Sequence, residues 1–277
     1  MLALAFAITI GSVMSPIGNP QNLLIAVNGE ITNPFITFFR YLLIPTLVNL
    51  AIGYFLLRLF YRKYFDHTVI AQSPEPIKDP KLARLTQISL VLLILLILVK
   101  IILVFAGVEI DFRLTYIAVA AALPIILGSP RRFQVIKKID WSTLVFFAAM
   151  FVLMQSVWDA GFVQSLIKST SLNLTSIGMI MVVSIVMSQF ISNVPLVALY
   201  LPVLMKLGVD GRQLMALAAG STIAGNLSVL GAASNVIIIQ NAEQKSGKTL
   251  TFLEFIKIGM PLTILNTLVY WVFFTIF

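Results

Sequence analysis

Apolar runs of about 20 residues, separated by short polar stretches, constrain the fold of this chain more than any other feature. A helix rises about 1.5 Å per residue, so such a run can cross a hydrocarbon core of about 30 Å. Of the 277 residues, 59% are hydrophobic and only 11% are charged, too few polar side chains to cover a water-facing surface. We therefore predict an all-α polytopic membrane protein with about seven to nine crossings of the lipid bilayer. The predicted spans are residues 2–28, 36–59, 85–108, 114–128, 141–158, 214–240 and 255–277.

The composition also excludes several classes of function. The sequence has no cysteine, which rules out a disulfide framework and thiolate metal ligands. It contains no Ser–His pair, paired aspartates or His-Glu-x-x-His motif, so we expect no enzyme activity and no catalytic residues. The net charge is +8, but no basic run is interleaved with aromatic residues, so we expect no nucleic-acid partner.

A hydrophilic stretch divides the chain. Residues 62–84 contain Ser73-Pro74-Glu75-Pro76 and Asp79-Pro80, and proline combined with charge opposes helix formation and burial. We predict three parts: residues 1–61, a linker of residues 62–84, and residues 85–277. If the linker is cytoplasmic, most Lys and Arg residues fall on the cytoplasmic side, as the positive-inside rule requires. We therefore expect a multi-pass protein of the plasma membrane with its C-terminus outside.

One apolar segment has a polar tip. Residues 174–205 carry Ser192-Asn193-Val194-Pro195 between apolar arms, of which the first is marginal for a span and the second too short. Ser and Asn are good N-caps, and Pro195 suits the first turn of a helix that begins there. We predict a re-entrant hairpin with this tip near mid-membrane and both ends on the outer face.

Two segments of the sequence repeat one another. Residues 15–25 and 228–238 share Ser, Gly and Asn at one constant spacing, and a proline-bearing helix follows each. On the predicted topology the first segment runs outward and the second inward. Inverted repeats with discontinuous helices are the plan of many secondary transporters. We therefore predict an inverted-repeat transporter with broken helices, whose first repeat is truncated because no counterpart of the hairpin precedes the first broken helix.

Each interruption of an apolar span leaves backbone groups that need partners. Opened helix N-termini offer N–H groups and a positive dipole to an anion, whereas free carbonyls with Ser and Asn oxygens suit Na⁺. The interrupted spans contain no ionisable side chain, which disfavours a proton relay. The candidate substrate and ion ligands are Ser15, Gly18, Asn19, Asn22, Ser192, Asn193, Ser228, Gly231, Ser234 and Asn235.

Among these candidates we expect the two asparagines Asn193 and Asn235 to contribute most to binding. Each lies at an opened helix end and offers one carbonyl oxygen and two N–H donors. The candidate Na⁺ ligands are Ser192, Asn193, Ser234 and Asn235. We expect no cofactor and no resident metal, with Na⁺ or H⁺ as the candidate coupling ion.

The same motifs resemble those of a known family. Met14 to Leu23, Ile139-Asp140-Trp141, Ser192 to Pro195, Gly225 to Ser228 and Gly231 to Asn235 are similar to the ion transporter superfamily, and within it to the arsenite-permease and citrate-transporter-like group. The resemblance implies a scaffold domain, a transport domain with opposed hairpins, elevator-type movement and frequent dimerisation.

The repeat and the resemblance together predict a function. We expect a secondary membrane transporter, or a truncated remnant of one, that moves a small anion or oxyacid such as arsenite or a carboxylate. Two alternatives stay open: a Na⁺/H⁺ antiporter of the same superfamily, and a non-transporting membrane subunit or fragment.

Overall fold

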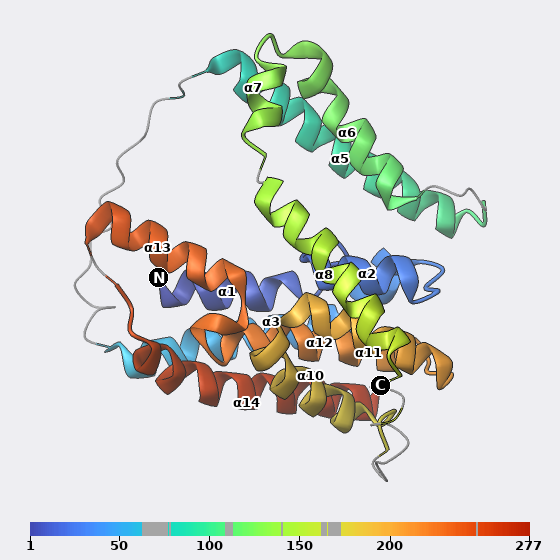
Figure 1. Ribbon diagram of the computed structural model, residues 1–277, viewed down its shortest axis with the longest axis vertical. Helices are drawn as coiled ribbons and strands as arrows, with labels where there is room; N and C mark the ends of the chain where they lie inside the picture. Colours follow the sequence, from blue (N-terminus) through green and yellow to red (C-terminus); the bar gives the residue numbers. More distant parts are fainter. Residues whose placement is uncertain are drawn as a thin grey trace. The chain divides into compact units, whose positions relative to one another are not determined.

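A computed structural model describes residues 1–62, 77, 79–108, 113–139, 141–161, 165, 173–247 and 249–277. All regular elements in these ranges are helices, which agrees with the predicted all-α class. The chain forms two compact units, one from residues 1–68 and 148–277 and the other from residues 69–147. Each unit is described separately below, with the element labels of Figure 1.

The smaller unit is built on an antiparallel helix pair, α5 (Pro80–Phe105) and α6 (Leu114–Gly128), followed by the short helix α7 (Arg132–Lys137). Helix α5 begins earlier than residue 85 because Asp79 caps it: the Asp79 Oδ1 atom accepts from the Leu82 N–H at 3.1 Å. Proline at the first helical position suits this start. The remaining part of the predicted linker, residues 63–76 and 78, lies outside the described residues.

The larger unit contains the two interrupted spans. Helix α1 is followed by α2 and the long helix α3, and later in the chain α12 is followed by two 3₁₀ turns, α13 and the long helix α14 (Figure 1). Helices α10 and α11 precede α12. The division between the units falls within α8 (Trp141–Asp159). The bounds are α1 Leu2–Ser12, α2 Pro20–Asn28, α3 Pro34–Phe60, α10 Ile177–Ile191, α11 Asn193–Lys206, α12 Gly211–Ile223, α13 Ala233–Ser246 and α14 Phe252–Ile276.

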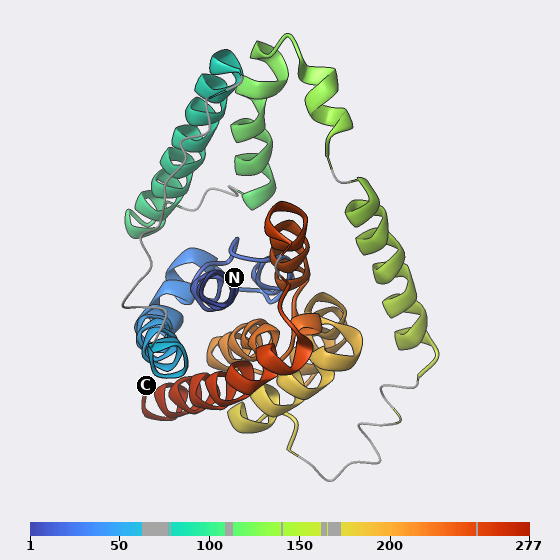
Figure 2. The same ribbon diagram turned by 90° about the vertical axis from the view of Figure 1, so that its left-hand side faces the viewer.

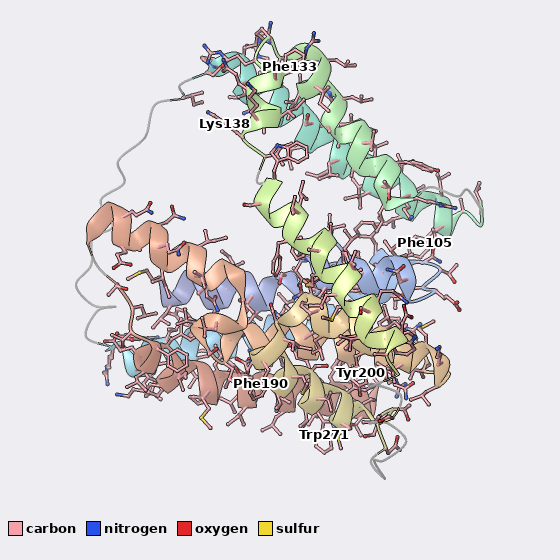
Figure 3. The ribbon with its side chains drawn as sticks, in the orientation of Figure 1. Phe105, Phe133, Lys138, Phe190, Tyr200 and Trp271 are labelled. Atoms are coloured by element: carbon pink, nitrogen blue, oxygen red, sulfur yellow. The ribbon has the colours of Figure 1, made fainter. Side chains whose placement is uncertain are left out.

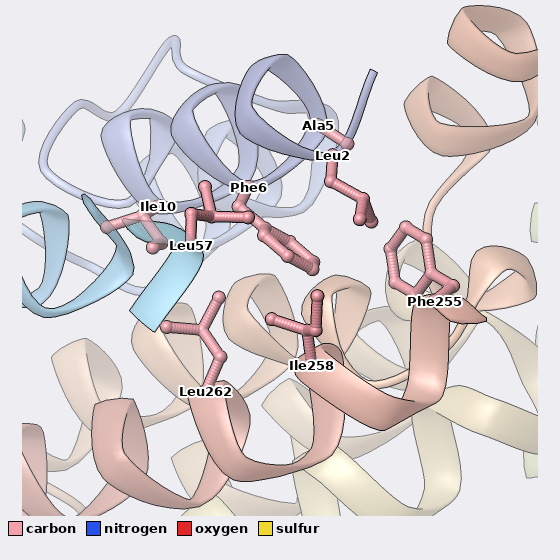
Figure 4. Close-up of a cluster of buried hydrophobic side chains, with 8 residues drawn as sticks. All are labelled: Leu2, Ala5, Phe6, Ile10, Leu57, Phe255, Ile258 and Leu262. Atoms are coloured by element: carbon pink, nitrogen blue, oxygen red, sulfur yellow. The ribbon is translucent and has the colours of Figure 1, made fainter. Parts of the chain in front are cut away.

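A hydrophobic cluster fixes α1 against α3 and α14. Helix α1 is apolar on nearly all sides, but its buried residues recur at helical spacing and lie on one face of the helix. On that face the ring of Phe6 packs edge-on against Phe255, with 5.2 Å between centroids. Because this packing holds α1 in place, it also positions the chain that leaves α1 at Ser12. The buried members, shown in Figure 4, are Leu2, Ala5, Phe6, Ile10, Leu57, Phe255, Ile258 and Leu262.

The long helices α3 and α14 lie side by side (Figures 1 and 2). Thr46 Oγ1 lies 2.7 Å from Tyr270 Oη, and Asn49 Nδ2 donates to the Asn266 carbonyl at 3.5 Å. As the α3 residue number rises, the α14 number falls, so the helices are antiparallel. All four residues are completely buried. Polar contacts of this kind hold helices together in an apolar environment.

Three described helices are long and apolar enough to cross a membrane: α3, α5 and α14. Shorter apolar helices of 10–17 residues accompany them, including α1, α6, α10 and α11. Of the candidate span in α5, only 6% is buried within the protein, so its apolar side chains face outward. A helix with this composition and exposure requires a lipid environment.

Candidate functional site

Break one, which we define as residues 13–19, separates α1 from α2. The Gly18 N–H donates to the Ser15 carbonyl at 3.1 Å, and a Cβ atom on Gly18 would collide with the Ser12 carbonyl oxygen. Only glycine therefore permits this turn. Asn19 then caps α2, because its Oδ1 atom accepts from the Asn22 N–H at 2.8 Å.

Asn22 holds break one closed from the first turn of α2. Its Nδ2 group donates to the carbonyls of Ser12, Val13 and Ser15, at 3.1, 3.2 and 3.1 Å. These are carbonyls that lose their helical partners where α1 ends. The Oδ1 atom of Asn22 accepts from Thr222 Oγ1 at 3.3 Å. The Asn22 side chain is completely buried, and its donor and acceptor groups are both used within the protein.

Break two, defined as residues 224–232, separates α12 from α13 and shares part of the hydrogen-bond pattern of break one. Asn235 Nδ2 donates to the carbonyls of Gly225 and Ser228, at 2.7 and 3.3 Å. The Gly231 N–H donates to the Ser228 carbonyl at 3.1 Å, and a Cβ on Gly231 would lie 2.7 Å from the Ala224 oxygen. Ser228, Gly231 and Asn235 are the residues that the sequence repeat aligns with Ser15, Gly18 and Asn22.

The two breaks differ in what they leave unpaired. At break two, both polar side-chain atoms of Asn226, and the Oδ1 atom of Asn235 in the first turn of α13, are buried without a hydrogen-bond partner among the described residues. The repeat aligns Thr9 with Thr222, and the Thr9 hydroxyl is also buried without a hydrogen-bond partner among the described residues. A Cβ on Gly225 would lie 3.3 Å from Thr9 Cγ2, so this hydroxyl belongs to a residue beside break two. Buried polar atoms without partners are costly and mark places where a ligand, ion or water can bind.

Break one and the end of α12 are joined through Thr222. Its Oγ1 atom accepts from Asn19 Nδ2 at 3.1 Å and lies 3.5 Å from Gln21 Nε2. Ser15 lies on the outer part of break one, where its hydroxyl accepts from the Ile17 N–H at 3.4 Å. Both Ser15 and Ser234, in the first turn of α13, are half-buried.

The predicted polar tip, Ser192 to Pro195, begins at the residue that separates α10 from α11, and its last three residues form the start of α11. The φ angle of Ser192 is +66°, an uncommon conformation for a residue other than glycine. The two helices pack antiparallel, because Tyr200 Oη of α11 donates to the Leu174 carbonyl near the start of α10, at 2.8 Å. Asn193 begins α11, is 6% exposed, and its Oδ1 atom has no partner in the described part of the chain.

Gln189 joins the last turn of α10 to break two. Its Nε2 group donates to the Ala224 carbonyl at 3.0 Å, and its Oε1 atom accepts from Ser228 Oγ at 2.9 Å. The last turn of α10, which precedes Ser192, is thereby linked to break two. Neither Gln189, Asn226, Thr222 nor Thr9 was among the residues predicted from sequence. The available signal was that each is a polar residue in an apolar run close to an interruption.

The described residues contain no group of three or more His, Cys, Asp or Glu side chains that could hold a metal ion. The polar atoms at break two and at Ser192 are therefore neutral amides, hydroxyls and backbone groups. Such groups can bind a small polar solute or coordinate a monovalent cation through oxygen atoms.

Together with the long apolar helices, the two broken helices define a multi-pass helical membrane protein of the transporter class. The citrate transporter family profile matches residues 1–213, and the chain belongs to this family. This membership confirms the predicted relation to the arsenite-permease and citrate-transporter group of the ion transporter superfamily.

Three relatives show how far the similarity extends. The P protein of Mus musculus is 32% identical over 58% of this chain, which corresponds to 21% of the P protein. "Putative transporter arsB" of Dictyostelium discoideum is 33% identical over 49% of this chain and 25% of its own length. Silicon efflux transporter LSI3 of Oryza sativa subsp. japonica is 25% identical over 96% of this chain and 68% of its own length. The chain thus spans about a fifth of the length of the P protein.

Proposed function

We propose that this chain is a secondary transporter, or a part of one, for a small anion or oxyacid. The unpartnered carboxamide of Asn226 and the unpartnered Oδ1 atom of Asn235, in a buried and uncharged setting, are the observation that carries the proposal. The family is named for citrate transport, and the rice relative is named for silicon efflux. Citrate and the soluble form of silicon are both rich in oxygen atoms, which amide and backbone N–H groups can bind.

We propose that the binding site comprises break two and the start of α11. Asn193, Asn226 and Asn235 supply the amide groups, and Ser192, Ser228, Gly231 and Ser234 line the opened backbone. The carboxamide of Asn226 offers both a donor and an acceptor to the solute. The Oδ1 atoms of Asn193 and Asn235 suit Na⁺, our preferred coupling ion, with H⁺ as the other candidate.

Break one has a different role in this proposal. Ser15, Gly18, Asn19 and Asn22 shape and close the break instead of binding the solute. Support comes from Asn22, whose donor and acceptor groups are already occupied by three carbonyls and one hydroxyl. A ligand at break one would have to displace these bonds.

The proposed inverted repeat rests on paired contacts. Helix α1 packs on α13 while α12 packs on α2, and α3 pairs antiparallel with α14. A two-fold operation that exchanges the first three helices with the last three would produce this pattern. Inverted repeats place substrate sites near the bilayer midplane and support alternating access. We accordingly propose elevator-type movement, with a homodimer as the assembly.

The topology can be tested directly because the chain contains no cysteine. We propose that residues 174–205 form a re-entrant hairpin, that residues 62–84 are cytoplasmic and that the C-terminus is outside, in the plasma membrane. Single cysteines at Asn173 and Lys206 should react from the outer side with an impermeant maleimide. Labelling of the two positions from opposite sides would show that the segment crosses the membrane.

Transport is tested by reconstituting the chain in vesicles and measuring fluxes of citrate, silicic acid and arsenite, with and without a Na⁺ gradient. We expect flux of one solute, and at least a tenfold decrease in Asn193→Ala. The matched control is Asn241→Ala, an exposed asparagine whose Nδ2 group, among the described residues, bonds only to the Ile237 carbonyl of its own helix. Proton movement driven by Na⁺ without solute flux would instead identify the antiporter alternative, and no flux of either kind would refute the proposal.

A further inference from the structure

We propose that one end of the smaller unit binds the phosphate groups of anionic phospholipids. We call this surface the basic end. It comprises two aromatic side chains and six basic ones, all on described residues of the unit. They are Phe133, Trp141, Lys81, Arg84, Arg131, Arg132, Lys137 and Lys138.

Two contacts bring these residues to the same end. Arg131 NH1 lies 3.2 Å from Asp79 Oδ2, which joins the start of α5 to the segment after α6. The Leu85 side chain packs against Gly128 at the end of α6. The first turns of α5 therefore lie beside α7. Figure 3 shows Phe133 and Lys138 at this end, with Phe105 at the opposite end of α5.

The charge of the basic end is concentrated and faces solvent. Residues 131–141 contain four basic residues and one acidic residue, Asp140, which lies outside the described residues; all four basic residues are exposed. Among the described residues, Asp79 is the carboxylate that pairs with this group, and the Arg131 side chain that pairs with it is still 62% exposed. Several cations held close together repel one another unless an anion lies between them. The surface is thus complementary to a negatively charged partner.

The aromatic residues indicate that the partner is a membrane surface. Phe133 is 68% exposed and Trp141 is 53% exposed, and the Arg132 guanidinium lies 5.3 Å from the Phe133 ring centre. The Trp141 Nε1–H donates to the Ile136 carbonyl at 3.0 Å, which holds the indole beside α7. Aromatic rings collect at the headgroup level of a bilayer, where one side of the ring meets acyl chains.

The adjoining helix favours lipid over a soluble acidic partner. Immediately beyond Lys81 and Arg84, α5 presents an apolar surface whose candidate span is only 6% buried. A ligand that covers both the cations and this surface needs a phosphate group joined to acyl chains. Clusters of four to eight Lys or Arg at the end of a span are expected to attract anionic lipids, by about 1 kcal/mol for each basic residue.

Trp141 provides a reporter within the basic end. In a Trp158→Phe, Trp271→Phe background it is the one tryptophan left, since the sequence has three. We would reconstitute this protein in vesicles of brominated phosphatidylglycerol or brominated phosphatidylcholine and measure quenching of its fluorescence. We expect phosphatidylglycerol to be bound at least about threefold more strongly than phosphatidylcholine. An attraction of about 1 kcal/mol for one basic residue corresponds to about fivefold. We set the threshold lower because the lipids beside the protein exchange with those of the bulk bilayer.

The charge-removal variant is Arg132→Gln, Lys137→Gln, Lys138→Gln, which keeps Arg131 and its ion pair. The matched control is Arg40→Gln, Arg58→Gln, Lys257→Gln, three exposed basic residues of α3 and α14. The ratio of phosphatidylglycerol binding to phosphatidylcholine binding should fall toward one in the charge-removal variant and should be unchanged in the control. Equal quenching by both lipids, or the same loss in both variants, would overturn the proposal.

Two further measurements keep the proposal falsifiable. If the tryptophan background does not fold, lipids retained by the otherwise unchanged chain can be counted by native mass spectrometry, where the first variant should retain fewer anionic lipids than the control. Millimolar soluble glycerol phosphate should leave the preference unchanged. If it abolishes the preference, the surface is a site for free anions, and the lipid proposal fails.

Discussion

We predict that Asn22→Ala destabilises the protein more than the equivalent substitution Asn235→Ala. Asn22 donates to three backbone carbonyls and accepts from Thr222, whereas Asn235 donates to two carbonyls and its oxygen is unpartnered. Both side chains are buried, so water does not replace the lost bonds. The comparison therefore measures how much the side-chain hydrogen bonds of each asparagine contribute to the free energy of unfolding.

The magnitude follows from the number of groups that lose a partner. A buried polar group left unsatisfied costs about 1–3 kcal/mol, and a hydrogen bond contributes about 1 kcal/mol net. The two N–H donors of Asn22 are shared among three carbonyls, so we expect Asn22→Ala to lower the free energy of unfolding by about 3–5 kcal/mol. With two carbonyls affected, Asn235→Ala should cost about 2–3 kcal/mol.

The chain supplies a matched control for each substitution. Asn28 and Asn241 are exposed asparagines of α2 and α13. In the described part of the chain, the Nδ2 group of each bonds only to the carbonyl four residues earlier. Their alanine variants should change the free energy of unfolding by less than about 0.5 kcal/mol. Reversible unfolding in mixed micelles, followed by circular dichroism, measures all four.

Two results would refute the reasoning. One is an Asn22→Ala variant as stable as Asn28→Ala, and the other is an Asn235→Ala variant less stable than Asn22→Ala. If Asn22→Ala does not fold, a second variant is Thr222→Val, which removes the bond to Asn22 Oδ1 and those from Asn19 and Gln21. It should lower the free energy of unfolding by about 2–4 kcal/mol.

Three further substitutions test other contacts. Gly231→Ala should lower the melting temperature, because its Cβ would lie 2.7 Å from the Ala224 oxygen, whereas Gly11→Ala, with open space around it, should leave the melting temperature unchanged or raised. Tyr270→Phe should cost about 1–2 kcal/mol in micelle unfolding, since it leaves the buried Thr46 hydroxyl without its partner. Gln189→Leu should raise the solute concentration for half-maximal flux about tenfold, because α10 loses its bonds to break two. Gln134 is an exposed residue of α7. An equal rise in that concentration with Gln134→Leu would contradict this role of Gln189.

The membrane class and the places where helices are interrupted could be predicted from sequence. Both depend on local composition: apolar runs predict spans, and Gly, Asn and Pro within such runs predict their breaks. The helices that flank Ser192 end and begin where the motif indicates, and break one lies within the first of the spans that were predicted to be broken. The start of α5 was predicted too late, because the cap formed by Asp79 outweighs the charge of the residues that follow.

The division of roles between the two breaks could not be predicted in this way. The sequence repeat makes Asn22 and Asn235 equivalent. Both lie at interruptions of apolar spans, so both were predicted as ligands of the substrate or ion. The difference arises from a contact across 200 positions, in which Thr222 satisfies Asn22 while Thr9 does not satisfy Asn235. Whether a polar atom has a partner depends on how distant helices pack, and composition does not report it.

The most direct test of the central claim compares Asn226→Ala with Ser15→Ala in vesicle flux of the transported solute, normalised to folded protein. Asn226 has two unpartnered buried polar atoms in break two, whereas the Ser15 hydroxyl bonds within break one. Because the solute is proposed to bind at break two, Asn226→Ala should lower flux at subsaturating solute at least about tenfold, or about 1.4 kcal/mol of binding. Ser15→Ala should stay within about twofold of the unmodified chain. Unchanged flux in Asn226→Ala, or an equal loss in Ser15→Ala, would contradict the placement of the site.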